Sequence, residues 1–217
     1  DRQAAVNSIL LGCSVGVAGT VLGFIFAFAV TRLSLPKWLC AAVSAVTLLP
    51  LISPPFTSSI ALTLSLGPNG ILLDFFGLGN FNFYGFWGTF ISETLTFFPV
   101  AFMTLSTILA RIDPNLEDAA YSLGASSFKV FRTVTLPLAA PGIANAFLLV
   151  FSCSLADFAT PQVLGGHSFP VLPTQAYLVI TGMYDFKGGA ALSFMLLIPA
   201  IIVYSLQRWW VGKKSYV

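Results

Sequence analysis

Five long apolar segments constrain this chain more than any other feature of its sequence. They cover approximately residues 5–31, 38–66, 86–110, 141–163 and 188–208. Each is long enough to cross the hydrocarbon core of a bilayer, which takes about 20 residues of α-helix. Because 57% of the 217 residues are hydrophobic and 8% are charged, a soluble domain of this size would leave much apolar surface in water. The sequence therefore predicts an all-α fold, a polytopic membrane helical bundle of about five transmembrane helices.

Two of these segments carry features that shape helix packing. The second holds three prolines within residues 50–55, so we expect this span to be kinked or broken. The first has glycines on one helical face, where a second helix can approach at backbone distance. These residues are Gly12, Gly16, Gly19 and Gly23. The glycine face can pack within the bundle, which is the interpretation we favour, or against another transporter half.

The placement of Lys and Arg predicts the orientation of the chain. With the C-terminus inside, only Arg2 and Lys187 lie outside, and the other basic residues gather on the cytoplasmic side. Those residues are Arg32, Lys37, Arg111, Lys129, Arg132, Arg208, Lys213 and Lys214. An odd number of spans then places the N-terminus outside. Since Asp1 is preceded by neither an initiator Met nor a signal peptide, we expect residues 1–217 to be one transmembrane domain of a longer polypeptide.

The longest polar interval between the spans, residues 111–137, has the signals of a helix–Gly–helix loop on the cytoplasmic side. Asp113 can cap a first helix and Gly124 can end it in a left-handed conformation. A serine at 126 or 127 can cap a second short helix, which Pro137 is expected to stop. The first helix has an apolar face at i, i+3, i+4 and i+7, formed by Leu116, Ala119, Ala120 and Leu123. A helix–Gly–helix hairpin outside the membrane has a shape that suits docking to another protein.

Motifs for catalysis and for nucleotide binding are missing. Without a GxxxxGK[ST] loop, any nucleotide that powers this protein must be bound by another polypeptide. His167 has no partner at ligand spacing, so we expect no metal site. Paired carboxylates and a nucleophile–base pair are also missing, so we do not expect an enzyme. The exterior loops are too small to form a ligand-binding domain, so a separate protein would have to capture a dilute solute.

Two acidic residues lie within predicted spans, where a charge costs roughly 2.5–3.5 kcal/mol at the bilayer centre unless it is paired or hydrated. Glu93 lies among Ser and Thr residues of the third span, and Asp157 precedes Thr160 in the fourth. Asp157, Glu93 and Thr160 can line a polar translocation path. Alternatively, each carboxyl is buried and bonded to neighbouring hydroxyls or helix ends. Both interpretations stay open at this point, with the structural one favoured for Glu93.

The polar interval resembles the EAA loop of permease subunits of ABC importers, the MetI-like type I family. The family pattern is E-A-A, three residues, G, nine residues and then I-x-L-P. This chain keeps the spacing, with Asp118-Ala119-Ala120, Gly124 and Val134-Thr135-Leu136-Pro137. Asp118 replaces the usual Glu and Val134 the usual Ile, which leaves charge and apolar character in place. Residues 48–56, 82–99 and 154–166 further resemble the ferric-iron branch of this family.

The resemblance implies a transport subunit that binds no cofactor, in a bacterial or archaeal inner membrane. Its implied partners are an ABC ATPase dimer that holds ATP and Mg²⁺, a second permease half, an extracytoplasmic solute-binding protein and membrane lipids, with no nucleic acid. The implied ATPase-coupling residues are Asp118, Ala119, Ala120, Gly124, Leu116, Leu123, Leu136 and Pro137. Ferric iron is the expected solute, with phosphonate, polyamine, sulfate or thiamine as alternatives. A secondary transporter driven by an ion gradient is the rival from another class; it needs charged relays, for which the spans offer two candidates.

Overall fold

The computed structural model describes residues 2–54, 57–67, 70, 71, 75, 83–166 and 168–213, and every element within these ranges is helical. The long helices are α1 (Arg2–Arg32), α5 (Phe86–Arg111), α8 (Leu136–Ala156) and α10 (Phe186–Lys213). The shorter elements are α2 (Lys37–Ile52), α3 (Thr57–Leu66), α6 (Pro114–Ser122), α7 (Ser127–Val130), η1 (Phe131–Thr135), η2 (Pro161–Gly165) and α9 (Leu172–Gly182). The all-helical fold predicted from the sequence is therefore confirmed.

Four helical runs of the described chain are long and apolar enough to cross a membrane, and a fifth span results if α2 and α3 count as one broken span. These two helices meet at 100°, on either side of the proline-rich break. The break was expected, because a proline lacks the amide hydrogen that continues a helix. Pro55 itself lies outside the described residues.

The fourth span differs from its prediction at both ends. We expected residues 141–163, with Pro137 as a stop, but α7, η1 and α8 form one run from Ser127 to Ala156. The turn at η1 is a π turn, in which the amide of Leu136 donates to the carbonyl of Phe131. This wider turn changes the backbone around Pro137, whose ring would otherwise collide with the carbonyl four residues earlier. At the other end, Asp157 adopts an extended conformation (φ −77°, ψ 120°) that ends the helix.

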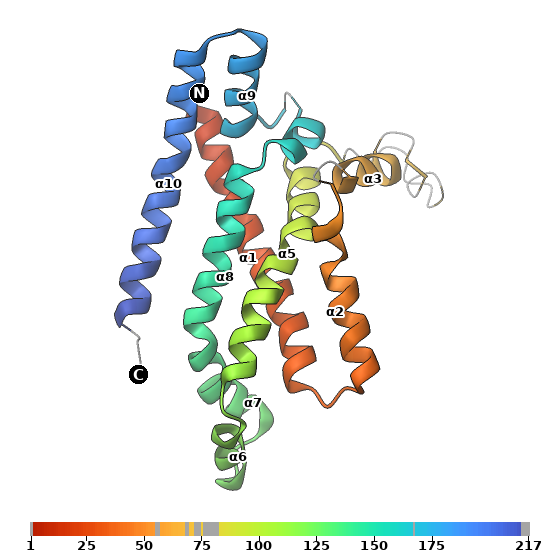
Figure 1. The fold of residues 1–217 in the computed structure, drawn as a ribbon, viewed down its shortest axis with the longest axis vertical. Helices are drawn as coiled ribbons and strands as arrows, with labels where there is room; N and C mark the ends of the chain where they lie inside the picture. The colour runs from red at the N-terminus through yellow and green to blue at the C-terminus, as the bar shows by residue number, and fades with distance from the viewer. Residues whose placement is uncertain are drawn as a thin grey trace.

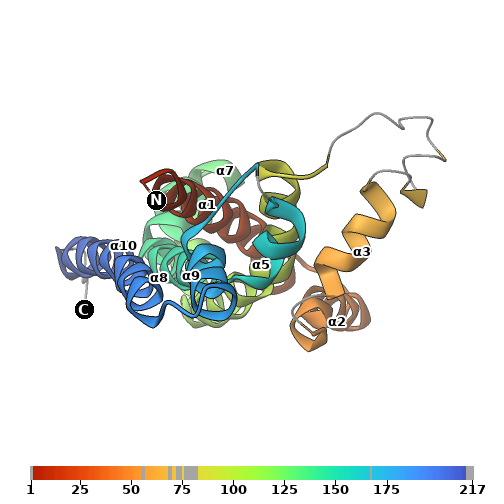
Figure 2. The same ribbon diagram turned by 90° about the horizontal axis from the view of Figure 1, so that it is seen from above.

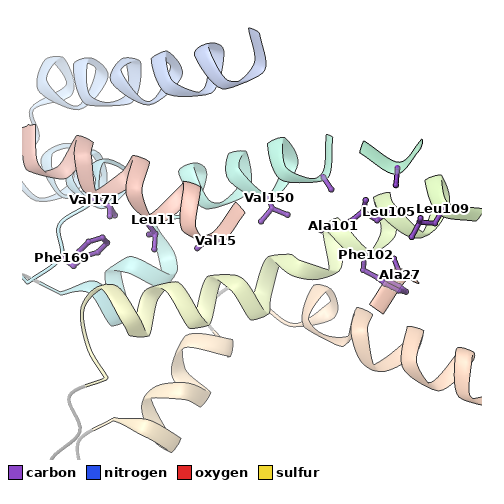
Figure 3. Close-up of a cluster of buried hydrophobic side chains, with 12 residues drawn as sticks. Leu11, Val15, Ala27, Ala101, Phe102, Leu105, Leu109, Val150, Phe169 and Val171 are labelled. Carbon is purple, nitrogen blue, oxygen red and sulfur yellow. The ribbon is translucent and has the colours of Figure 1, made fainter. Parts of the chain in front are cut away.

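The core lies between α1, α5 and α8, which pack side by side (Figure 1). In the view from above, α10 lies on one side of these three helices, and α2 and α3 lie on the other (Figure 2). Buried side chains follow the bundle lengthwise, from Leu11 and Val171 near one end to Ala27 and Leu109 near the other (Figure 3). The molecule thus has an elongated core that follows the bundle axis.

The glycine face of α1 packs inside this core. A Cβ atom on Gly23 would lie 2.6 Å from the Cβ of Ala101 and 2.7 Å from the backbone nitrogen of Phe102, both on α5. A Cβ on Gly16 would lie 2.7 Å from the ring of Phe147 on α8. Because these neighbours belong to the same chain, the predicted packing of the glycine face within the bundle is confirmed.

The helix ends are grouped in space. The end of α1, the start of α2 and the end of α5 lie at the same end of the bundle as α6 and α7 (Figure 1). The start of α1, the start of α10 and α9 lie at the opposite end. The basic residues of these segments are therefore segregated along the bundle axis as the sequence predicted.

Candidate functional site

The polar interval folds as a helix–Gly–helix hairpin beyond one end of the bundle. Asp113 caps α6 by accepting a hydrogen bond from the amide of Asn115 (3.0 Å), and Ser126 caps α7 by accepting one from Lys129 (3.4 Å). Between them, Gly124 has φ +79°, a left-handed conformation that favours glycine. The amide of Ala125 donates to the carbonyl of Ala120 (3.1 Å), which is the hydrogen bond of a Schellman motif. The predicted hairpin is confirmed.

The outer side of the hairpin carries apolar side chains without cover. No residue of α6 is buried, and Leu116 is 49% and Leu123 is 89% exposed. Asp118 and Ala119 are also exposed, whereas Ala120 is half-buried. Exposed apolar residues on a polar loop beyond the membrane-spanning region are typical of a protein–protein contact. We call Leu116, Asp118, Ala119, Ala120 and Leu123 the docking face.

The inner side of the hairpin is attached to the bundle through Glu117. One oxygen of its carboxylate lies 3.5 Å from Nη1 of Arg32, at the end of α1. The other oxygen accepts a hydrogen bond from the hydroxyl of Thr135 in η1 (2.7 Å). Our sequence reasoning missed Glu117, Arg32 and Thr135 as functional candidates. No local pattern could relate Arg32 to Glu117, since 85 residues separate them.

Two other predicted coupling residues lie apart from the docking face. Leu136 is half-buried in the first turn of α8 and lines an apolar groove of about 690 Å³ between α1, α8 and α10. Pro137 is exposed beside it. Both lie at the start of α8, directly after α7 and η1, so their place in the structure is that of a connection between the hairpin and the spans.

A buried polar cluster occupies the opposite half of the bundle. Glu93 on α5 is fully buried, and one carboxylate oxygen accepts a hydrogen bond from the hydroxyl of Ser154 on α8. Its other oxygen has no hydrogen-bond partner among the described residues. The hydroxyl of Ser92 lies 3.4 Å from that of Ser59 on α3. Glu93 therefore bonds to a neighbouring hydroxyl, as its structural interpretation predicted, while one oxygen stays available.

Asp157 and Thr160 lie in the turn that follows α8. The carboxylate of Asp157 accepts hydrogen bonds from the amides of Ala159 (2.8 Å) and Thr160 (3.4 Å), so it caps the next helical turn. Asp157 is half-buried and Thr160 is 1% exposed. Ser154, the partner of Glu93, precedes Asp157 by three residues. The structure thus places all three path candidates around the same end of α8.

The described residues contain no group of three or more His, Cys, Asp or Glu side chains that could hold a metal ion. His167 lies outside those residues. The arrangement as a whole is that of a helical bundle with exposed apolar side chains on a hairpin at one end and buried polar groups toward the other.

Comparison with known proteins found a family model and relatives that this chain resembles. The sequence model of a family described as "Binding-protein-dependent transport system inner membrane component" matches residues 19–215. The chain is 39% identical to the ferric transport system permease protein FbpB of Actinobacillus pleuropneumoniae, over 97% of this chain and 31% of that protein. It is 34% identical to the molybdenum transport system permease protein ModB of Haemophilus influenzae, over 94% of this chain and 92% of that protein. The chain thus spans less than a third of the ferric permease's length but nearly all of the molybdenum permease's.

Solved structures share the fold. The inward-facing MetNI methionine ABC transporter matches with a TM-score of 0.80 and 17% identity, over 99% of this chain and 95% of that chain. A bacterial alginate ABC transporter, in complex with an alginate pentasaccharide-bound periplasmic protein, matches with a TM-score of 0.80 and 17% identity, over 95% and 76%. At this identity the likeness concerns the fold alone.

Proposed function

The chain belongs to the family of binding-protein-dependent transport system inner membrane components, and from this membership we propose that it forms one half of the membrane pathway of an ATP-driven type I ABC importer. As a member with several apolar spans, it is a multi-pass inner-membrane protein. The observation that carries the proposal is the hairpin of α6 and α7, which presents uncovered apolar side chains beyond the end of the bundle.

In the proposed mechanism, the docking face occupies a cleft on an ATPase subunit. The alanines allow close approach of the partner, and Leu116 and Leu123 supply apolar area. Asp118 makes a polar contact at the edge of this interface. Gly124 permits the left-handed turn, and Leu136 and Pro137 are the first two residues of α8, into which the hairpin continues. ATP and Mg²⁺ are held by the partner. Closure of the ATPase dimer would move two such loops and swing the spans between inward-open and outward-open states.

The proposed orientation places the hairpin in the cytoplasm. Arg32, Lys37, Arg111 and Lys129 belong to helix ends on the hairpin side of the bundle, where the positive-inside rule expects them. The N-terminus of the described chain is then outside and the C-terminal end of α10 is inside. The end of α8 with Asp157, Thr160 and Glu93 lies in the outer half, where an extracytoplasmic binding protein would deliver solute to the path.

Ferric iron is the proposed solute, on the strength of the ferric permease relatives. Hard oxygen ligands for Fe³⁺ would be supplied by the binding protein, and the carboxylates of Asp157 and Glu93 offer oxygen groups along the path. A second candidate is an oxyanion such as molybdate, because the molybdenum permease relative is matched over nearly its whole length. The half-buried carboxylate of Asp157 would repel an anion, which favours the cation.

The test is uptake into proteoliposomes that contain this chain, its second half (fused or separate), the ATPase and the binding protein. We expect labelled ferric iron to accumulate only with ATP. Accumulation that continues with a hydrolysis-deficient ATPase would exclude an ABC importer and favour the gradient-driven rival. Accumulation of molybdate in place of iron, under the same ATP requirement, would keep the mechanism and change the solute.

A further inference from the structure

We propose that Arg32, Glu117 and Thr135 form a clamp that sets the orientation of α6 relative to the spans and transmits its movement to α1, α5 and α8. The inference rests on the proposed function for its transport consequence, but its geometry concerns this chain alone. We call these three residues the loop clamp. They act as positioning residues, since none of them belongs to the docking face.

The clamp joins four elements through three side chains. Nη2 of Arg32 donates to the carbonyl oxygens of Leu109 (2.8 Å) and Ile112 (3.0 Å), at the C-terminal end of α5. Nη1 of the same guanidinium lies 3.5 Å from Glu117 on α6, whose second oxygen accepts from Thr135 in η1. The last carbonyls of a helix lack donors within the helix. Arg32 donates to the carbonyl of Ile112, and it adds a second donor to the carbonyl of Leu109, which also accepts from the amide of Ile112 (3.3 Å), at the point where α5 leads into the hairpin. α1, α5, α6 and η1 therefore meet at one guanidinium–carboxylate pair.

The environment makes this pair stronger than an ordinary surface ion pair. The side chains of Arg32 and Glu117 are 10% and 16% exposed, so water screens their charges only in part. A guanidinium is planar and carries several donors in fixed directions, which suits three acceptors in different directions. A lysine at this position has a single ammonium group and would not match that geometry.

Nothing else among the described hydrogen bonds and ion pairs joins an α6 side chain to the bundle. The adjoining segment is held differently, because Val130 is buried and Phe131 packs edge-on against Phe24 and Phe28 of α1. α6 has nine residues, none of them buried, and a helix this short has little stability of its own in water. α6 also packs against α7 and η1, so Glu117 is the side chain that links it by hydrogen bond and ion pair to α1 and η1.

The two neighbouring acids thus have opposite surroundings. Glu117 faces Arg32 and Thr135, whereas Asp118 is exposed on the docking face. A force applied to the docking face reaches Glu117 within the same helical turn and passes through Arg32 to α1 and α5, and through Thr135 to α8. The acid that meets the partner and the acid that moves the spans are different residues.

The first test measures α6 in this chain alone. Spin labels at Ser122→Cys on α6 and Thr107→Cys on α5, both exposed positions, are placed in a background without Cys13, Cys40 and Cys153. We expect Arg32→Gln to broaden the inter-label distance distribution about twofold or more, because α6 then loses its ion pair to α1 and keeps only its weaker contacts with α7 and η1. The matched control Arg111→Gln removes a neighbouring exposed arginine and leaves the width unchanged. An unchanged width in Arg32→Gln overturns the clamp.

The second test measures transport in the complete assembly. The unaltered protein must first show ATP-dependent uptake. If it does not, the proposed function is contradicted, whereas the result of the spin-label measurement on the clamp is unaffected. We then expect Thr135→Val to lower the amount of solute imported per ATP hydrolysed by several-fold, up to about tenfold. This is the change in an equilibrium constant that the loss of one hydrogen bond produces. Thr135→Ser keeps the hydroxyl and should restore the ratio. Equal ratios in Val and Ser variants, with equal ATPase rates, would show that Thr135 only fills space.

Discussion

Gly23 offers the sharpest test of how the spans pack. The Cβ of an alanine there would lie 2.6 Å from the Cβ of Ala101, 2.7 Å from the nitrogen of Phe102 and 2.9 Å from the carbonyl carbon of Ala101. Two of these three atoms are backbone and cannot rotate away, so α1 must move from α5. Overpacking of this kind costs typically about 1–3 kcal/mol, and atoms this close place the cost near the upper limit. Alanine regains about 1 kcal/mol through its higher helix propensity, so we expect Gly23→Ala to destabilise the fold by about 2 kcal/mol.

Gly12 provides a matched control on the same face of α1. An alanine Cβ at Gly12 would lie 3.1 Å from the ring of Phe151, which must give by a few tenths of an ångström, a small cost that the higher helix propensity of alanine offsets. We therefore expect Gly12→Ala to be nearly neutral. The measurement is reversible unfolding of both variants in the same detergent. If Gly23→Ala is as stable as Gly12→Ala, the close approach of α1 and α5 is not a determinant of stability and the packing argument fails.

Three further predictions concern transport. Gly124→Val should uncouple ATP hydrolysis from uptake while leaving the spans folded. The φ of +79° at this position costs a β-branched residue roughly 1–2 kcal/mol, although no atom lies within 4 Å of the new Cβ. Normal uptake per ATP hydrolysed would contradict the role of this turn. Asp157→Asn keeps an oxygen that can accept a hydrogen bond from the amide of Ala159 but removes the charge. We therefore expect ferric uptake to fall without loss of thermal stability. Unchanged uptake kinetics would show that Asp157 acts only as a helix cap. Leu123→Asp should not alter stability, since this side chain is 89% exposed, but should weaken binding of the ATPase about tenfold by removing the burial of one leucine, measured by co-purification across a concentration series.

The parts of this molecule that depend on local pattern were predictable from its sequence. The apolar segments, the break near Pro54 and the caps at Asp113 and Ser126 each follow from residues within a few positions of one another. The glycine face of α1 predicted a close contact, although the sequence did not say with which helix. The identity of the contacting helices, α5 and α8, is a property of the whole bundle.

The parts that depend on distant residues or unusual backbone were not predictable in this way. Pro137 was expected to stop a helix, but a π turn upstream lets the helix continue, and no residue type marks a π turn as proline marks a break. Glu117 looked like an ordinary first-turn acid until Arg32 came within 3.5 Å of it. The end of the fourth span at Ala156 likewise depends on Asp157, whose capping bonds run to residues after it and not before it.

The π turn at Phe131–Thr135 determines how the whole hairpin is oriented about the axis of α8. Relative to a regular α-helix, it inserts one extra residue between α7 and α8, and one residue corresponds to about 100° of rotation and about 1.5 Å of rise. Deleting a single residue there would restore a regular helix and turn everything before it through that angle about the axis of α8. The rotation of α6 about the axis of α8 is therefore set by the number of residues between α7 and α8, and side-chain contacts then hold α6 in that orientation.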